Sequence, residues 1–453
     1  MRSIHPVLNI IKKKFSSQFI RNVGWLSISE IIYRVLRLGL VVIIARFLSR
    51  HDYGLGAIVM TVREFSLTFA DVGIAAKIIQ AEEEELEDLC NSAYWLSWVV
   101  FLSLFLIQSI AAFPIAWFYQ SPNLILPIIV SGLAYLIWPL STIQKTLIQR
   151  ENRLKVIAIT NSLQNLIGSI LSAIFAVSGM GVWSLVLPPI LAAPMEPLIY
   201  YRAHPWRLNT GFTTKNWRHI LNFGKNILGV SLLKTLRNNL DYLLVGRFVV
   251  NPEDPEYGIK ELGLYFFGFN AGLGISLSFI KAINSAILPH LCAVRAEFSE
   301  LKISYFNSLK TIRATIVPFV ILQSSLAHIY VPIVFGKKWQ SAIPIVVLIC
   351  LSAIPRPFAD AASQLLIAVG KPHLDLHWNV LFTILFSVAI LIGVNLQVLG
   401  VDTSVLSVHL GEHWQIIVVA ISVLLVHIVF LPLFTLWATR YVFPKTKKNE
   451  GLL

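Results

Sequence analysis

The sequence consists largely of apolar blocks of 20 residues or more, separated by short polar links. A helix needs about 20 apolar residues to cross the ~30 Å hydrocarbon core of a bilayer, whereas the strands of a membrane barrel alternate over about ten residues. Charged residues make up 13% of the chain, about half the usual share of a soluble domain, and the mean hydropathy is +0.70. The sequence therefore predicts an all-α integral membrane protein with many spans.

The apolar blocks predict about 12 transmembrane helices arranged as two lobes of about six. The expected helices cover residues 22–48, 54–76, 91–118, 123–146, 156–178, 182–202, 220–249, 262–291, 308–333, 342–368, 374–398 and 414–440. We divide the chain into a basic cytoplasmic lead-in (1–21), an N-lobe (22–202), a cytoplasmic connector (203–219), a C-lobe (220–440) and a cytoplasmic tail (441–453).

Lysine and arginine are distributed unevenly between the two sides of the expected bundle. We count 24 of the 37 at the termini and in the even-numbered loops, against six in the odd-numbered loops. Because cytoplasmic loops carry an excess of Lys and Arg, we expect both termini in the cytoplasm.

The remaining seven cations lie within expected helices, where a charge near the bilayer centre costs about 2.5–3.5 kcal/mol on insertion scales. They are Arg34, Arg37, Arg63, Lys234, Arg237, Lys281 and Arg356. The acidic residues of the same helices are Glu30, Glu64, Asp71, Asp241 and Asp360. Charges at this depth are tolerated where they face protein or a water-filled cavity, so these residues mark the candidate functional site.

Two interpretations of these charges remain open. Glu30, Arg34 and Arg37 share one helix face, and pairs such as Glu30 with Arg34 or Arg237 with Asp241 could be structural ion pairs. The cations outnumber the acids, however, and the rigid donor fork of arginine suits phosphate. We therefore predict a cationic central cavity that binds a phosphate-bearing substrate.

The expected helix 342–368 carries Arg356, Asp360 and Gln364 at intervals of four, with prolines at 355 and 357. A proline lacks a backbone donor and clashes with the preceding turn, so this pair is expected to break the helix. Broken helices at membrane depth occur beside cavities or within protein, which adds this segment to the candidate site.

The two halves of the chain share an internal resemblance. At a shift of 200, residues 22–37 align with residues 222–237, which places Lys234 over Arg34 and Arg237 over Arg37. Each half would contain an even number of helices, so both halves would insert in the same orientation. This predicts two lobes related by an axis along the membrane normal, as in parallel-repeat transporters.

Motifs for covalent chemistry are absent from the sequence. It contains no P-loop, no G-x-G-x-x-G and no C-x-x-C. The stretch HLGEH (409–413) matches a zinc motif, but no partner ligand is evident. The sequence therefore predicts a transporter rather than an enzyme, with no catalytic residues, no cofactor, no metal and no nucleic-acid partner.

Several stretches carry a family resemblance: ARFLSRHDYGLGAIVM (45–60), FADVGIAAKIIQ (69–80), LIQRENRL (147–154), LKTLRNNLDYLLVGRF (233–248), VFGKKWQSAIPIVVLICLSAI (334–354) and LLIAVGKP (365–372). With them the chain resembles the polysaccharide-export flippases of the multidrug/oligosaccharidyl-lipid/polysaccharide (MOP) exporter superfamily. The resemblance is greatest to Wzx-type flippases and to colanic-acid-type and teichuronic-acid-type exporters.

This resemblance implies two lobes in a V that alternate between inward-open and outward-open states in the bacterial inner membrane. The cargo would be an oligosaccharide on undecaprenyl diphosphate, a precursor of lipopolysaccharide or exopolysaccharide, whose phosphates meet the cations. Glu30, Asp71, Asp241 and Asp360 would serve ion coupling or structural pairing. We expect a monomer in contact with membrane lipids, with polymerase and export machinery acting after it.

Other functions stay open at this point. A multidrug antiporter of the same superfamily should have a net-acidic cleft, and a membrane glycosyltransferase or polymerase typically needs a large loop or soluble domain. A non-transporting scaffold would leave the cations within the membrane unexplained. The sugar repeat unit and the coupling ion cannot be read from the sequence.

Overall fold

The computed structural model describes residues 39–70, 73–209, 211–251, 253–294, 297–396 and 404–444. Within these ranges the chain consists of helices joined by short links and contains no named strand, so the predicted all-α class is confirmed. Residues 39–47 are helical. The labelled elements that follow it are α3 (Arg50–Ala70), α4 (Ile74–Gln80), α5 (Glu83–Phe118), η1 (Pro122–Leu124), α6 (Ile125–Ser131), η2 (Gly132–Leu136), η3 (Trp138–Leu140), α7 (Thr142–Arg150), α8 (Leu154–Val177), α9 (Trp183–Ala192), α10 (Met195–Ala203), α11 (Trp217–Phe248), α12 (Tyr257–Val294), α13 (Phe298–Ser325), α14 (Ala327–Tyr330), η4 (Val331–Phe335), η5 (Lys337–Ala342), α15 (Ile343–Ser352), α16 (Arg356–Ala368), α17 (Pro372–Val394), α18 (Ser404–Leu410) and α19 (Trp414–Val442).

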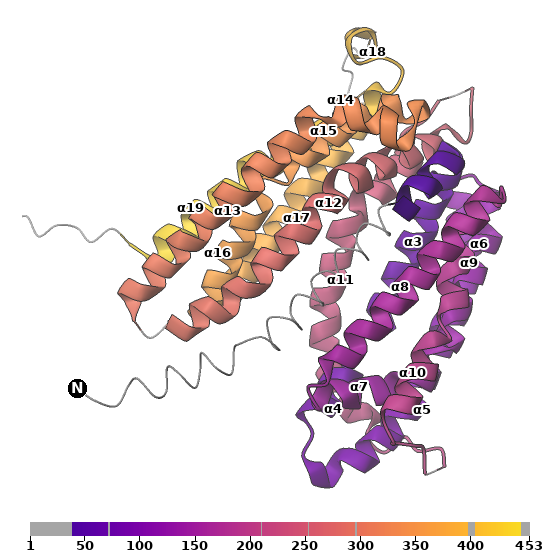
Figure 1. Ribbon diagram of the computed structural model, residues 1–453, viewed down its shortest axis with the longest axis vertical. Coiled ribbons are helices and arrows are strands. Elements are labelled where there is room, and N and C mark those ends of the chain that lie inside the picture. Colours follow the sequence, from indigo (N-terminus) through magenta and orange to yellow (C-terminus); the bar gives the residue numbers. More distant parts are fainter. Residues whose placement is uncertain are drawn as a thin grey trace, which may run out of the picture.

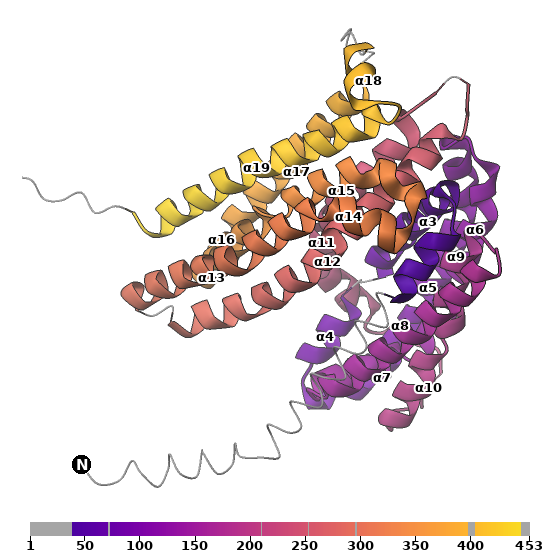
Figure 2. The same ribbon diagram turned by 45° about the horizontal axis from the view of Figure 1, so that its top comes forward.

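The helices form two groups that meet at one end and diverge toward the other (Figure 1). The first group contains α3–α10 and the second contains α12–α19, and the view in Figure 2 shows the same divergence. Helix α11 lies between them. Its first turns pack on the first group, where Trp217 donates to the carbonyl of Ser92 and Ile220 is buried against Ile78. Farther along, α11 packs on α12 and α17 of the second group.

Membrane crossing is supported by length and composition. Six helical stretches of the described chain are long and apolar enough to span a bilayer, or seven if the pair bent by 46° between α13 and η4 counts as one. They include 83–118, 154–177, 372–394 and 414–442. The protein is therefore a multi-pass membrane protein, whereas the number of about 12 spans stays a prediction.

Two of the expected spans are interrupted. The helix expected at 342–368 ends at Ser352 and starts again at Arg356, so the predicted break at the proline pair is confirmed. The span expected at 123–146 overlaps the candidate span Pro122–Leu140, but it is divided into short 3₁₀ and α segments that continue to Arg150. Prolines at 122, 127 and 139 remove backbone donors along this stretch and favour the tighter turns.

Basic loops gather at the open end of the first group, away from the point where the groups meet. Arg150 donates to the carbonyl of Ile78 at 2.9 Å and pairs with Glu83 at 2.7 Å. Lys215 of the connector pairs with Asp88 at 2.8 Å. The loops of the first group that the charge count assigns to the cytoplasm therefore lie together, and the orientation of the termini stays a prediction.

Candidate functional site

The predicted site residues fall in three places. Glu30, Arg34, Arg37 and Asp71 lie outside the described residues, and Lys281 lies on α12 in a stretch whose side chains are not described. The remaining residues lie on three helices. These are Arg63 on α3, Lys234, Arg237 and Asp241 on α11, and Arg356 and Asp360 on α16.

Asp241 is the most buried of the charged residues in this set, with 3% of its surface exposed. One carboxylate oxygen accepts a hydrogen bond from the Tyr265 hydroxyl at 2.9 Å, and the other accepts one from the backbone amide of Tyr242 at 3.0 Å. Arg356 lies close enough to act on Asp241 electrostatically. A buried carboxylate needs such partners, so Asp241 joins α11, α12 and α16 into one polar cluster.

Arg237 and Asp241 lie on the same helix, but their side chains contact different neighbouring helices. Its guanidinium donates to the side-chain oxygen of Asn379 on α17 and lies 5.8 Å from the ring centre of Phe382. Asn379 in turn donates to the carbonyl of Asp375 at 2.9 Å. The ion pair between Arg237 and Asp241 that the spacing allowed is not among the ion pairs of the described residues, because each side chain turns to a neighbouring helix instead.

Carboxylates accompany both arginines of this cluster. Asp360 and Asp375 act electrostatically on Arg237, and Asp241 and Asp360 act on Arg356. The Nε atom of Arg356 and one oxygen of Asp375 are buried and have no hydrogen-bond partner in the described part of the chain. The cluster therefore combines two arginines with three carboxylates and has hydrogen-bonding capacity left over, so a net positive charge in a cavity has to come from other residues.

Arg63 differs because, within the described ranges, the side chain that acts on it electrostatically is Tyr135 and not a carboxylate. Its guanidinium lies 5.7 Å from the ring centre of Trp138, and its Nε atom is buried without a hydrogen-bond partner there. A cavity of about 10 Å³, room for roughly one water, is lined by Arg63 and Ser131. Next to it, Gln108 accepts from the Tyr135 hydroxyl at 2.7 Å and donates to Ser131 at 3.0 Å. Arg63 is thus a cation with unused donors in a polar setting.

The helices that carry Arg63 and Lys234 run side by side. Thr61 of α3 donates to Asn239 of α11 at 3.3 Å, and farther along Thr68 bonds Thr235 at 2.8 Å. Lys234 itself is exposed. Both cations thus belong to one antiparallel helix pair, as expected if they serve one site.

The two groups meet in what we call the joint, formed by residues 45–54, 256–267 and 334–341. Helices α3 and α12 approach closely at two glycines. A Cβ atom on Gly54 would overlap the carbonyl oxygen of Ile259, and one on Gly263 would overlap that of Arg50. Small residues permit such backbone contact between membrane helices, so the joint depends on both positions being glycine.

Side chains within the joint also donate hydrogen bonds across it, mostly to backbone carbonyls of the facing segment. Arg50 donates to the Lys338 carbonyl and to the Ser341 hydroxyl, both at 2.9 Å. Lys338 donates back to the carbonyls of Arg46 and Leu48 at 2.8 and 2.6 Å. Trp339 is fully buried and donates to the carbonyl of Ala45 at 2.8 Å. These bonds are lost if the two groups separate at this end.

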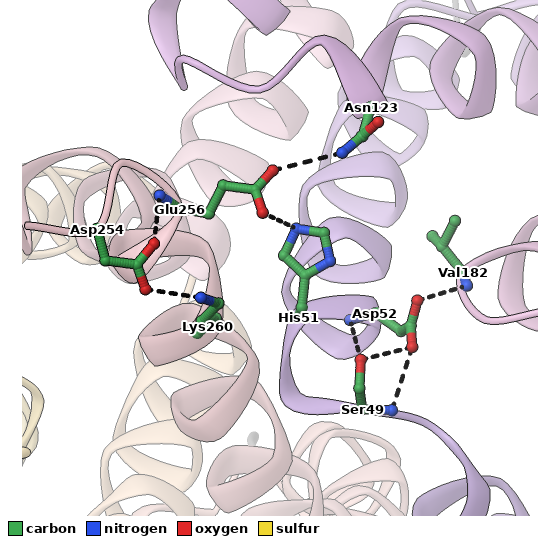
Figure 3. A network of polar contacts seen from close by, with 8 residues as sticks. All are labelled: Ser49, His51, Asp52, Asn123, Val182, Asp254, Glu256 and Lys260. Carbon is green, nitrogen blue, oxygen red and sulfur yellow. Dashed lines mark hydrogen bonds and ion pairs between the residues drawn. The ribbon is translucent and has the colours of Figure 1, made fainter.

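A second set of polar contacts continues the joint around α3 (Figure 3). Glu256 pairs with His51 at 3.3 Å and accepts from Asn123 of η1 at 3.3 Å, so one carboxylate links three segments. Asp52 accepts from the backbone amide of Val182 at 3.0 Å. Asp254 bonds Lys260 nearby, and this hydrogen bond holds the pKa of Asp254 below its usual range. Loops from both halves of the chain are therefore fastened together at this end.

Sequence reasoning missed several residues of the site. Tyr265, Asn379 and Asp375 complete the cluster around the two arginines, yet each lies on a different helix from Arg237 and Arg356. The joint was missed as a unit because Arg50 and Lys338 are 288 residues apart. The HLGEH stretch has a structural use instead, since His413 bonds the buried carboxylate of Glu261 at 2.7 Å. No group of three or more potential metal ligands occurs in the described chain.

Comparison with known proteins places the chain in a family. The model of a family described as "Polysaccharide biosynthesis protein" matches residues 43–344. The lipopolysaccharide biosynthesis protein WzxC of Escherichia coli (strain K12) is 25% identical over 82% of this chain and 74% of its own length. The teichuronic acid biosynthesis protein TuaB of Bacillus subtilis (strain 168) is 21% identical over 80% of this chain and 74% of its own.

Solved structures match the fold over most of the chain. The lipid II flippase MurJ, in an inward closed conformation, superposes with a TM-score of 0.65 at 14% identity, covering 91% of this chain and 87% of that one. An inward-facing multidrug resistance MATE family transporter of the MOP superfamily gives 0.64 at 13% identity, covering 91% and 94%. The predicted superfamily fold is thereby confirmed. The chain belongs to the polysaccharide biosynthesis protein family and has the fold of MOP-superfamily transporters.

Proposed function

We propose that the protein is a flippase that moves a lipid-linked oligosaccharide, carried on an undecaprenyl-diphosphate-type lipid, across the inner membrane. The observation that carries this proposal is the family match, which extends over residues 43–344 and so covers parts of both helix groups. The names of its relatives WzxC and TuaB connect the family with lipopolysaccharide and teichuronic acid synthesis. MurJ, a flippase of another lipid-linked precursor, shares the fold.

The phosphates of the cargo are proposed to meet cations between the two helix groups. The proposed set is Arg34, Arg37, Arg63, Lys234, Arg237, Lys281 and Arg356. Two features of the described residues support it: Arg63 has no carboxylate in ion-pair contact, and Arg356 has a buried donor without a partner. Bonds from a guanidinium to phosphate are charge-assisted and stronger than neutral ones, which suits a diphosphate that leaves water.

Transport is proposed to occur by alternating access without covalent chemistry. The described conformation is closed at the joint, and we assign it to an inward-facing state with the joint on the outer side of the membrane. The positive-inside distribution of Lys and Arg supports this assignment, as do the inward-facing and inward-closed states of the two solved structures. Opening of the joint would expose the cargo to the outer leaflet, and polymerase and export machinery would act after this step.

The acidic residues are proposed to divide between two tasks. Asp241 serves structural pairing, since its contacts with Tyr265, Tyr242 and Arg356 use its charge within the cluster. Glu30, Asp71 and Asp360 are the candidates for coupling to an ion gradient. The protein is proposed to work as a monomer.

Deletion of the gene in its host tests the proposed function. We expect surface polysaccharide to disappear and undecaprenyl-linked oligosaccharide to accumulate on the cytoplasmic side, with both effects reversed by the plasmid-borne gene. Extracted lipid-linked intermediates are measured by mass spectrometry. Normal polysaccharide without accumulated intermediate would contradict the proposal, and sensitisation to drugs in its place would favour the multidrug antiporter.

A further inference from the structure

A cavity of about 530 Å³ opens between the ends of α5 and α11, beside the joint. Phe113, Trp117 and Phe118 of α5 and Ile125 of α6 form much of its wall, and Arg247 of α11 closes it. A volume of this size lies within the range of about 300–1,000 Å³ that ligand pockets have. The cavity is therefore large enough for part of an amphiphilic molecule.

The position of the cavity indicates the edge of the hydrocarbon layer. Helix α5 is one of the stretches long and apolar enough to span a membrane, and the cavity lies at its last turn. Trp117 is 82% exposed and Phe113 is 59% exposed there. Tryptophan is enriched where a span meets the headgroup region. The wall thus offers apolar surface to a lipid chain at the depth where lipid phosphates begin.

Arg247 supplies a cation at this depth. Its guanidinium lies 5.5 Å from the ring centre of Phe118, and Arg247 is in none of the ion pairs of the described residues. Gln120 adds an amide to the same wall and has a φ of 55°, in the left-handed region. Backbone bonds from Gln120 to Trp117 and from Ser121 to Ala116 hold this turn in place. A cation and an amide beside apolar rings match a phosphate with an attached acyl chain.

We propose that this pocket binds an anionic phospholipid of the surrounding leaflet, with the phosphate on Arg247 and an acyl chain along Phe113, Trp117 and Ile125. The site is separate from the proposed cargo cations and does not depend on the proposed function. Because α5 and α11 both line it, the bound lipid holds their two ends together beside the joint. Asn123, which follows the pocket residue Pro122, bonds Glu256 of the joint, so the wall of the pocket is itself fastened there.

Native mass spectrometry of the full-length protein in detergent tests this site. Phosphatidylglycerol or phosphatidylcholine with identical acyl chains is added, and bound lipid is counted for three proteins. We expect more phosphatidylglycerol than phosphatidylcholine on the wild type and about tenfold weaker phosphatidylglycerol binding to R247Q. K337Q removes an exposed cation from the same end of the molecule outside the pocket and should bind like the wild type. Equal binding of the two lipids, or unchanged binding to R247Q, would overturn the proposal.

A second variant and a competing lipid distinguish a phospholipid site from a site for the cargo. W117A removes an exposed part of the wall and should also weaken phosphatidylglycerol binding, which keeps the test open if R247Q fails to fold. A polyprenyl monophosphate is then added as competitor. Retention of phosphatidylglycerol supports a separate lipid site. Its displacement by polyprenyl monophosphate at a concentration below that of the phosphatidylglycerol would show that the pocket belongs to the cargo and overturn the proposal.

Discussion

Replacement of Gly263 by alanine is expected to open the joint. The new methyl group would overlap the carbonyl oxygen of Arg50 and crowd the amide of Gly54 on the facing helix. Neither backbone atom can move without moving its whole helix, so α3 and α12 must separate. Overpacking of this kind costs about 1–3 kcal/mol, which corresponds to a shift of about 5- to 150-fold in the population of the joined state. Gly54→Ala should act in the same direction through the carbonyl of Ile259.

Pulsed electron paramagnetic resonance measures this shift. Spin labels on cysteines introduced at Ser178 and Gln340, both exposed and on opposite groups near the joint, report the distance across it in a protein without its native cysteines. Gly229→Ala on α11 is the matched control, because outside the backbone of α11 itself no heavy atom of the described residues lies within 4 Å of the position its methyl group would take. A distance distribution that stays unchanged in G263A and G54A would contradict the role of the glycines.

The double variant R63Q/K234Q is expected to lose transport. Each substitution removes a cation proposed to bind phosphate, and a hydrogen bond to a charged group contributes about 1.5–3 kcal/mol. Loss of two such contacts should lower transport at limiting substrate about a thousand-fold if their effects add. The measurement is the amount of surface polysaccharide restored to the deletion strain, relative to membrane expression of the protein.

The variant K302Q/K310Q is the control for the loss of two positive charges, because it removes two exposed cations from α13. This variant should restore polysaccharide like the wild type. The charge-preserving R63K should restore part of the activity, since lysine keeps the charge but lacks the donor fork of arginine. Full activity of R63Q/K234Q would rule out both residues as phosphate contacts.

Hydropathy was sufficient to predict most of the fold. The ranges expected for 156–178 and 374–398 correspond closely to α8 and α17, and the range 91–118 ends where α5 ends but misses its first eight residues. An uninterrupted apolar block leaves a membrane chain little alternative to a helix. The break before Arg356 also followed from local chemistry, since proline cannot continue a helical ladder. The division into short segments after Pro122 was missed, because several of its residues are compatible with either a 3₁₀ or an α turn.

The joint shows that local sequence patterns do not predict contacts between segments far apart in the sequence. The stretches 45–60 and 334–354 carried the family resemblance, yet nothing in either indicates that Trp339 should donate to the carbonyl of Ala45. Such a contact depends on the packing angle of helices far apart in sequence. The same holds for Arg237, whose spacing favoured Asp241 as partner although Asn379 on α17 takes the contact. Charged residues at membrane depth singled out α3, α11 and α16 as candidates, whereas the partners of these residues were set by the tertiary fold.

Transbilayer movement in reconstituted vesicles tests the central claim most directly. Purified protein is placed in vesicles whose membrane contains a polyprenyl-diphosphate-linked oligosaccharide, and an added lectin or glycosidase reports the fraction exposed on the outside over time. The wild type is expected to make the inner pool accessible, while protein-free vesicles and R63Q/K234Q vesicles retain it. Equal rates with the wild type, with the variant and without protein would contradict the assignment as a flippase.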